Sequence, residues 1–474
     1  MSSFNLKDRP TIARRLARVV ATGMVMVVVA VGSLEGATFK IRLQEGTPPP
    51  GLTDGVQFLD QISITNNGQI YFGGDTTAAS ADEFFYKATL KPFSATLVAR
   101  EGDAIPAQAG ITFGAFDAVN GMNENGDFVF VSASQPGPLD VIGLNGLQYL
   151  RAGGTFNGEA VNSFHHPQID GAGTPWYLAD LGPNSATDIS LFHGNTLLFR
   201  EGGMVDGVPI ATIVTSESTS GSNFRVNEAG DYMIVVDDGD AQGQDVHIIM
   251  NGDNILESGD LIPNAGIVYW FNQIGMTADG SHWFVQLSYP SESNPQFAGN
   301  EAFILDGTTL LIEQGQGLGD GLLVGTIQTG DVNKDGHWIV RVDLAGTGTG
   351  QDAIIIDGQI VARTGDPVDA NFNWGSSIGF INDIRLNDCG AIALIADLVP
   401  SAGGSAVETL LTGSMFDDGD VNGDGAVDEN DWDAFVDALI NDAAPVCNVW
   451  RADINEDGFA DGRDVGPFVE AILP

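Results

Sequence analysis

Residues 353–363 read AIIIDGQIVAR: two apolar runs, Ala353–Ile356 and Gln359–Arg363, flank the pair Asp357-Gly358. An Asp-Gly or Asn-Gly pair between apolar runs is a strong signal for a β-hairpin, because both turn positions need a positive φ. A short turn of this kind recurs through the chain, at Gly146, Gly194, Gly252, Gly307, Gly358 and Gly413. The chain is therefore a repeat of hairpins, and the period of the repeat decides the architecture.

Two further markers recur at the same interval. One is an apolar strand that ends in a turn such as Arg100-Glu101-Gly102-Asp103, with copies at Gly46, Gly102, Gly153, Gly202, Gly259, Gly315 and Gly365. The other is a polar turn before an alternating strand, with copies at Gly68, Gly126, Gly173, Gly230, Gly280, Gly336 and Gly390. Successive copies of the first marker lie 49 to 57 residues apart, which gives seven units in the range of propeller repeats.

Each unit holds enough alternating segments for four antiparallel strands, which is the makeup of a propeller blade. We therefore predict a mainly β fold, with a seven-bladed β-propeller over residues 38–415. The start of this region, Thr38–Leu43, supplies one strand, and Val407–Leu411 supplies the beginning of a blade that lacks its remainder. We infer that the two ends complete one shared blade. A β-solenoid is the alternative, although solenoid periods are normally shorter and stricter.

The repeated phrases also carry a resemblance. Val98–Asp103 and Asn387–Ala393 resemble motifs of a poorly characterised family of exported bacterial propeller-like repeats. These motifs are structural turns, so the resemblance implies a fold and no activity.

The composition changes after Asp417. The segment Asp420–Asp431 has oxygen-bearing side chains at loop positions 1, 3, 5, 9 and 12, and Gly425 at position 6 allows a sharp turn. This is the spacing that a calcium ion requires, with a backbone carbonyl at position 7. The pattern recurs 33 residues later in Asp453–Asp464. We predict two calcium ions, held by Asp420, Asn422, Asp424, Ala426, Asp428 and Asp431 and by Asp453, Asn455, Asp457, Phe459, Asp461 and Asp464, with Ala426 and Phe459 acting through their carbonyls.

A helical apolar stripe follows each loop, at the spacing i, i+3, i+4, i+7, i+8. The first stripe is Trp432, Phe435, Val436, Leu439 and Ile440, and the second is Val465, Phe468, Val469, Ile472 and Leu473. Residues 418–474 thus look like a type I dockerin, a small module with paired EF-hand-like loops. The resemblance implies docking onto a cohesin module or another surface protein, often to gather polysaccharide-degrading enzymes. Loop positions 10 and 11, Glu429-Asn430 and Gly462-Arg463, depart from the Ser/Thr pairs of many dockerins.

The N-terminus is typical of an export signal. Arg14, Arg15 and Arg18 precede an apolar run of about 13 residues, which is short for a membrane span. We assign residues 1–37 to a signal peptide, with Gly32, Ser33 and Ala37 as candidate cleavage positions. We expect an exported protein with no stable membrane insertion after cleavage. Export would permit a disulfide between Cys389 and Cys447, but they lie in different predicted domains and we expect them to be unpaired.

The formal charge of -44, with only 19 Lys and Arg, excludes nucleic acid as a natural partner because phosphate backbones would be repelled. Divalent cations are the natural counter-ions of such a chain. The 62 glycines fit an all-β protein rich in tight turns. Outside the tail, the acids are interpreted as a solvated surface.

Two possible metal sites have simpler explanations. Asp331–Gly336 resembles the start of a calcium loop, but Ile339 occupies position 9 and the segment coincides with the hairpin turn of the repeat. His165-His166 is an adjacent pair, whose side chains would point to opposite faces of a strand. We expect that pair to lie in a surface loop.

Two patterns that could suggest catalysis or sugar binding are similarly explained. Gly375–Gly379 matches Gly-x-Ser-x-Gly, but a nucleophile elbow needs a helix next and Phe380–Leu386 is typical of a strand. We interpret the tryptophans as inter-blade core rather than a sugar platform; they are Trp176, Trp270, Trp283, Trp338 and Trp374.

These observations predict an exported, calcium-binding, non-catalytic scaffold protein whose tail attaches it to a partner. The alternative is a dockerin-borne glycoside hydrolase acting on polysaccharide. Such an enzyme needs two carboxylates placed in space, and the sequence does not select them among 63 acids.

Overall fold

The computed structural model describes residues 39–473, except 107, 138, 184–187, 215–222, 240–245, 292–293, 320, 346–350, 376–382 and 442. Contacts divide the chain into two units, Met1–Ser33 and Leu34–Pro474. The first unit and the rest of the predicted signal segment lie outside the described residues. Everything below concerns the second unit.

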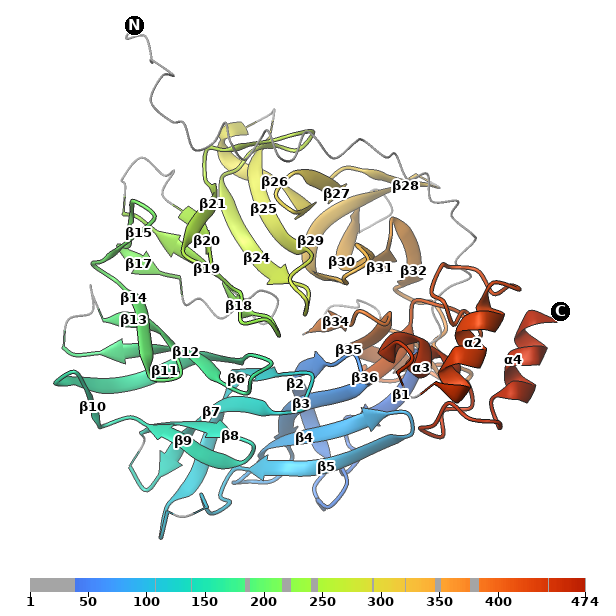
Figure 1. The fold of residues 1–474 in the computed structure, drawn as a ribbon, viewed down its shortest axis with the longest axis horizontal. Coiled ribbons are helices and arrows are strands. Elements are labelled where there is room, and N and C mark those ends of the chain that lie inside the picture. The colour runs from blue at the N-terminus through green and yellow to red at the C-terminus, as the bar shows by residue number, and fades with distance from the viewer. Residues whose placement is uncertain are drawn as a thin grey trace, which may run out of the picture. The chain divides into compact units, whose positions relative to one another are not determined.

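Seven antiparallel sheets of four or five strands form the blades of a β-propeller, which confirms the predicted mainly β fold and the blade count (Figure 1). Blade 1 consists of β2 (Val56–Ile64), β3 (Gln69–Thr76), β4 (Glu83–Leu90) and β5 (Phe93–Arg100), and blade 2 of β6 (Thr112–Met122), β7 (Phe128–Gln135), β8 (Asp140–Leu144) and β9 (Leu147–Arg151). Blade 3 consists of β10 (Thr155–Phe156), β11 (Glu159–Ile169), β12 (Pro175–Leu181), β13 (Ile189–His193) and β14 (Thr196–Arg200). Blade 4 consists of β17 (Thr212–Ile213), β18 (Phe224–Val226), β19 (Tyr232–Asp237), β20 (Val246–Met250) and β21 (Asp253–Glu257).

The remaining blades follow the same order along the chain. Blade 5 consists of β24 (Trp270–Met276), β25 (Trp283–Ser291), β26 (Asn294–Leu305) and β27 (Thr309–Glu313). Blade 6 consists of β28 (Gly317–Gly319), β29 (Leu322–Val332), β30 (Trp338–Ala345), β31 (Asp352–Ile356) and β32 (Gln359–Arg363). Blade 7 consists of β33 (Phe372–Trp374), β34 (Ile384–Leu386), β35 (Ala391–Pro400), β36 (Val407–Ser414) and β1 (Phe39–Gln44). Two small hairpins lie between blades, β15 (Met204–Val205) with β16 (Val208–Pro209) and β22 (Leu261–Ile262) with β23 (Gly266–Ile267).

The outer hairpin of each blade follows from its turn residues. Asp357 and Gly358 have φ values of 48° and 82°, and Asn145 and Gly146 have 53° and 77°, as the Asp-Gly and Asn-Gly signals predict. The turn predicted at Gly413 is wrong, because this residue lies inside β36 and pairs with Phe39. No fourth strand follows β36 in sequence, so the chain has no reason to turn back there.

The ring is closed by strands from opposite ends of the propeller sequence. β1 pairs antiparallel with β36, with Phe39 opposite Gly413 and Ile41 opposite Leu411. This confirms the shared blade inferred from the sequence.

The core lies mainly between neighbouring blades. One cluster joins Tyr71 and Phe85 of blade 1 to Phe128 and Phe130 of blade 2, and the rings of Tyr71 and Phe128 stack at 5.2 Å. The core interpretation of the tryptophans is confirmed for Trp176, Trp338 and Trp374, which are buried, and for Trp283, which packs partly against a core cluster. It is wrong for Trp270, which is 38% exposed because it begins β24 at one end of the sheet.

The histidine pair also departs from expectation. His165 and His166 lie in β11 rather than in a surface loop, at a break in the register with β12. His166 is buried and has a φ of 47°. The irregular backbone carries this side chain inward, which a simple strand alternation would not predict.

The tail contains three short helices, α2 (Asp431–Ile440), α3 (Val446–Ala452) and α4 (Val465–Ile472). The rings of Phe435 on α2 and Phe468 on α4 stack at 3.8 Å, so the two predicted stripes do meet. Val436 and Ile440 of the first stripe remain exposed. None of the helices among the described residues has the length and apolar character needed to cross a membrane.

Candidate functional site

The first tail loop is organised by its two buried end residues. The carboxylate of Asp420, at position 1, accepts hydrogen bonds from the amides of Gly423, Asp424 and Gly425 at 2.7 to 3.2 Å. The carboxylate of Asp431, at position 12, accepts from the amides of Asn422 at 3.0 Å and Asp428 at 2.9 Å. These bonds hold positions 3 to 9 of the loop in a closed turn.

The second loop repeats this frame except for the bond from position 4, which only the first loop has. Asp453, at position 1, accepts from the amides of Asp457 at 3.1 Å and Gly458 at 3.0 Å. Asp464, at position 12, accepts from the amides of Asn455 and Asp461, both at 2.9 Å. The two copies therefore share backbone geometry as well as sequence.

The negative charges of the loops are close enough to perturb one another. Burial raises the pKa of Asp420 to about 6, and the charge of Asp431 adds to the rise. Burial likewise raises the pKa of Asp431 and of Asp453. A cation near these carboxylates would favour their ionised forms.

The donor set suits a hard cation, since all twelve predicted ligand positions offer oxygen. Within the part of the chain that the structure describes, no group of three or more His, Cys, Asp or Glu side chains is placed to hold a metal ion. The end carboxylates instead bind amides of their own loop, and in the second loop Arg463 contacts Asp457 at 2.6 Å. A bound ion would have to draw in the outer side chains at positions 3, 5 and 9.

The tail is joined to the propeller by features that the sequence analysis missed. Cys389 and Cys447 form a disulfide, so the expectation that they are unpaired is wrong. Cys389 lies in the turn between β34 and β35, and Cys447 lies on α3. The two predicted domains are in contact here, which no local pattern indicates.

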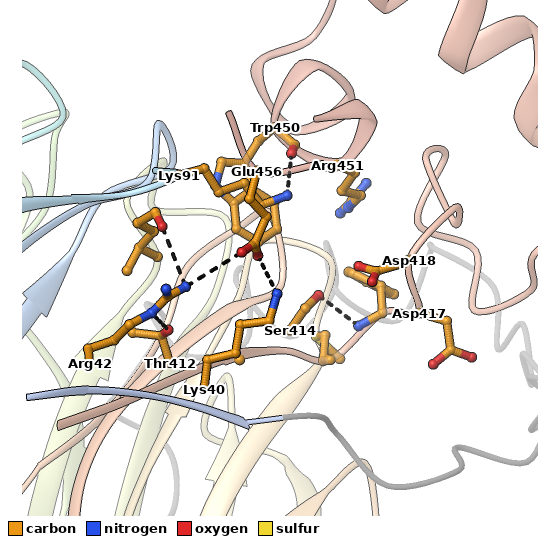
Figure 2. A pocket seen from close by; sticks show the side chains of 14 residues that line it. Lys40, Arg42, Lys91, Thr412, Ser414, Asp417, Asp418, Trp450, Arg451 and Glu456 are labelled. Carbon is orange, nitrogen blue, oxygen red and sulfur yellow. Dashed lines mark hydrogen bonds and ion pairs between the residues drawn. The ribbon is translucent and has the colours of Figure 1, made fainter. Parts of the chain in front are cut away.

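A cavity of about 120 Å³ lies between the tail and the closing blade (Figure 2). It is lined by four basic side chains, a notable share of the 19 in the chain: Lys40, Arg42, Lys91 and Arg451. Lys91 donates hydrogen bonds to the carbonyls of Trp450 at 2.9 Å and Asp453 at 2.8 Å. Lys40 pairs with Glu456 at 2.8 Å. The basic groups neutralise part of the acidic tail where it meets the propeller.

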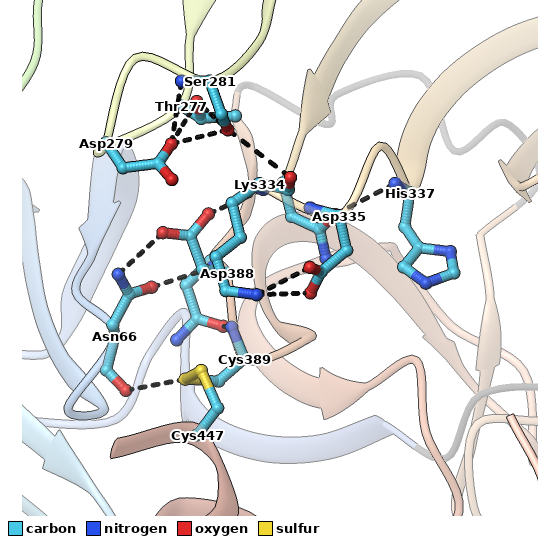
Figure 3. Close-up of polar contacts among 12 residues, drawn as sticks. Asn66, Thr277, Asp279, Ser281, Lys334, Asp335, His337, Asp388, Cys389 and Cys447 are labelled. Carbon is cyan, nitrogen blue, oxygen red and sulfur yellow. Dashed lines mark hydrogen bonds and ion pairs between the residues drawn. A yellow bond between two sulfur atoms is a disulfide. The ribbon is translucent and has the colours of Figure 1, made fainter. Parts of the chain in front are cut away.

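A second cavity, of about 150 Å³, opens at the centre of the ring and is lined by residues from all seven blades. The inner turns around it are hydrogen-bonded from blade to blade. The backbone amide of Asn66 in blade 1 donates to Glu124 of blade 2. The backbone amide of Asp388 in blade 7 donates to the side-chain oxygen of Asn66 at 2.8 Å (Figure 3). Lys334 of blade 6 donates its amide to Asp388 at 2.8 Å. The acids in this cavity thus have a structural explanation as links between blades.

Two other predictions from the sequence concern Asp331–Gly336 and Gly375–Gly379. Asp331–Gly336 forms a hairpin turn in which Asn333 accepts the amides of Asp335 at 3.1 Å and His337 at 2.9 Å, as expected for the repeat. Most of the Gly375–Gly379 match lies outside the described residues.

Comparisons with known proteins add no identity. No family model and no curated protein sequence matches the chain. Among solved structures, hydrazine synthase from Kuenenia stuttgartiensis aligns with a TM-score of 0.40 and 8% identity, covering 75% of this chain and 98% of that one. A neuraminidase-like protein from A/flat-faced bat/Peru aligns with a TM-score of 0.32 and 10% identity, covering 81% and 94%. Similarities this low carry no argument, and the seven blades rest on the strand pairings described above.

Proposed function

We propose that this protein is an exported, non-catalytic scaffold that binds two calcium ions in its tail and attaches through that tail to a partner protein. The observation that carries the proposal is the matched hydrogen-bond frame of the two loops. In both copies position 1 accepts the amides of positions 5 and 6, and position 12 accepts those of positions 3 and 9. Two chance acidic turns have no reason to share this frame. The resemblance to a dockerin is consistent with it.

In this proposal, Asp420 and Asp431 would hold the ion of the first loop, and Asp453 and Asp464 that of the second. Calcium would add positive charge next to buried carboxylates whose pKa values are raised. The loop amides already orient these carboxylates, and the ring pair Phe435–Phe468 holds the two loop-helix units together. The tail would therefore be ordered most fully with the metal bound.

Titration calorimetry on a chain of residues 38–474 tests the calcium sites. We expect two ions per chain, with dissociation constants in roughly the micromolar range or below. Asp424→Asn and Asp457→Asn, at position 5 of each loop, should each weaken one site by roughly tenfold, about 1.4 kcal/mol. Asn keeps the oxygen that accepts the loop amide, so the frame itself should persist.

Asp433→Asn is the matched control, because it removes an exposed carboxylate just beyond the first loop. It should leave both sites unchanged. The absence of calcium uptake by the wild-type chain would refute the proposal. If Asp433→Asn weakened calcium binding equally, the effect of the loop substitutions would be a general effect of charge.

A further inference from the structure

The tail meets the propeller at the seam where the ring closes. β1 is the first strand of the described chain, and it completes blade 7 only by pairing with β36. On its other side β1 has no strand partner in the sheet. The ladder between β1 and β36 therefore helps to close the ring, together with the hydrogen bonds that join blade 7 to blade 1.

Tail residues contact three elements at this seam: the inner turn of blade 7, the turn between β4 and β5 of blade 1, and β1. The Cys447–Cys389 disulfide fixes α3 to the inner turn of blade 7. Lys91, in the turn between β4 and β5 of blade 1, lies 4.2 Å from the centre of the Trp450 ring and donates to two tail carbonyls. Lys40 and Arg42 project from β1 itself toward Glu456, at 2.8 Å and 3.9 Å.

Arg451 extends the same contact to the first loop. Its Nε donates to the carbonyl of Cys389 at 3.1 Å, and its guanidinium lies 4.4 Å from the centre of the Phe416 ring. A Cβ on Gly423, in the first loop, would lie only 2.3 Å from its Nη1. One buried arginine is thus packed between the blade 7 turn and the first loop.

The groups that hold the seam belong largely to the second candidate calcium loop. Asp453 is position 1 of that loop and gives its carbonyl to Lys91, and Glu456 is position 4. Gly458, at position 6, approaches the propeller so closely that a Cβ there would lie 2.9 Å from Cδ of Pro92. A change in the conformation of this loop must therefore be felt at the seam.

We propose that the tail has a second function, as a clamp that holds the propeller ring closed, and that calcium in the second loop tightens it. A ligand that binds the docked form of the loop more tightly than the undocked form stabilises the docked seam by the difference between the two binding free energies. The charge balance favours this role: residues 417–474 hold sixteen Asp and Glu against two Arg, and the docking surface collects basic groups. The calcium half of the inference rests on the proposed function, and the mechanical half does not.

Hydrogen–deuterium exchange on the chain of residues 38–474 measures the opening of the seam, with peptides covering β1 and β36 as readout and β31 as internal reference. Calcium should slow exchange in β1 and β36 several-fold and leave β31 unchanged. Lys91→Met removes the two hydrogen bonds but keeps the apolar stem. It should speed exchange in β1 and reduce the effect of calcium there. Cys447→Ser should also speed it.

Lys334→Met is the matched control, since the Nζ of Lys334 donates to the neighbouring exposed Asp335, away from the tail contacts of the seam. It should behave like the wild type. If calorimetry shows two bound ions but β1 exchanges equally with and without calcium, the calcium link is overturned. If calorimetry shows no bound ions, the proposed function fails. The clamp is then tested by measuring the exchange of β1 in calcium-free buffer. Unchanged β1 exchange in both Lys91→Met and Cys447→Ser would overturn it.

Discussion

One of the carboxylates that join the last blade of the ring to the first is Glu408. Glu408 on β36 accepts a hydrogen bond from the amide of Leu59 on β2 at 2.5 Å, across the blade boundary. Equivalent acids recur in the third strands of other blades, where Glu83 accepts the amide of Phe116 and Glu301 that of Ile327. In each case the strand that carries the donating amide has a register shift at that point, which frees this amide from the ladder.

We expect the contribution of Glu408 to the stability of the folded chain to depend on pH. Burial raises the pKa of Glu408 from 4.5 to about 7, and the charges of Asp397, Asp60 and Glu45 add to the rise. A pKa that is higher in the folded state means that the folded chain binds more protons than the unfolded chain. The stabilising contribution is therefore complete below pH 4.5 and is lost as the pH rises through about 7.

Glu408→Gln keeps an oxygen acceptor for the Leu59 amide and cannot ionise. We expect this variant to be more stable than the wild type at about pH 8, by on the order of 1–3 kcal/mol, with the difference shrinking toward pH 4.5. Urea denaturation at fixed calcium concentration over this pH range measures it. Glu470→Gln, at an exposed position on α4, should show no such trend. A pH-independent difference would mean that Glu408 does not titrate as inferred.

At the scale of single elements, the sequence predicts an element well when residues near it in the chain determine its conformation. The Asp357-Gly358 hairpin is readable because the turn itself demands positive φ values, whereas Gly413 follows an apolar run in the same way but lies in a strand. Nothing around Gly413 in sequence reveals that its strand pairs with Phe39, far away in the chain. α3 was missed because seven residues are too few for a helical stripe, and its position depends on contacts with the propeller.

The outer face of α2 is where the proposed attachment should occur. Trp432, Val436 and Ile440 lie at i, i+4 and i+8 and are 39%, 44% and 78% exposed. Phe435 on the inner face is buried against Phe468. The ring of Trp432 also contacts that of Phe468 edge-on at 5.2 Å, so Val436 and Ile440 are the part of the stripe that faces outward, as a partner-binding helix requires.

We expect Val436→Lys to weaken calcium-dependent binding of a purified cohesin module by more than tenfold, because it places a charge in an apolar contact. Surface plasmon resonance with the immobilised module gives the affinity. Leu147→Lys is the control, since it makes the same change at an exposed leucine on β9 of blade 2. If the wild-type chain does not bind the module, the partner is not of the cohesin kind. Equal loss in both variants would argue against a site on α2.

At the scale of the whole molecule, the repeat period predicted the ring, but not the contacts that join its distant parts. Cys389 and Cys447 are 58 residues apart and lie in regions of different composition, so only the fold brings them together. The acid at Glu408 looks like one of many solvated carboxylates until its neighbour in the next blade is known. The candidate calcium loops could be proposed from the sequence because all the proposed ligands of each loop lie within twelve consecutive residues.

The closing strand offers a test of the ring as a whole. Phe39 of β1 is buried with its ring 5.4 Å from that of Trp374, and Leu43 is buried in the separate cluster shared with blade 1. β1 thus contributes to the core on both faces of blade 7. Burying two such side chains is worth about 1.5–3 kcal/mol each, in addition to the strand ladder.

A chain that begins at Glu45 should therefore melt at a temperature lower by on the order of 5–10 °C, because blade 7 loses its outer strand and β36 becomes an edge. A synthetic peptide of residues 39–46 should restore the melting temperature when added in excess, since it can pair with that edge. The same peptide with Ile41→Pro should fail, because proline interrupts the ladder. Differential scanning calorimetry distinguishes these results. Equal melting of the shortened and complete chains would show that the ring does not depend on β1, whereas rescue by only the unaltered peptide would locate its closure in this one strand.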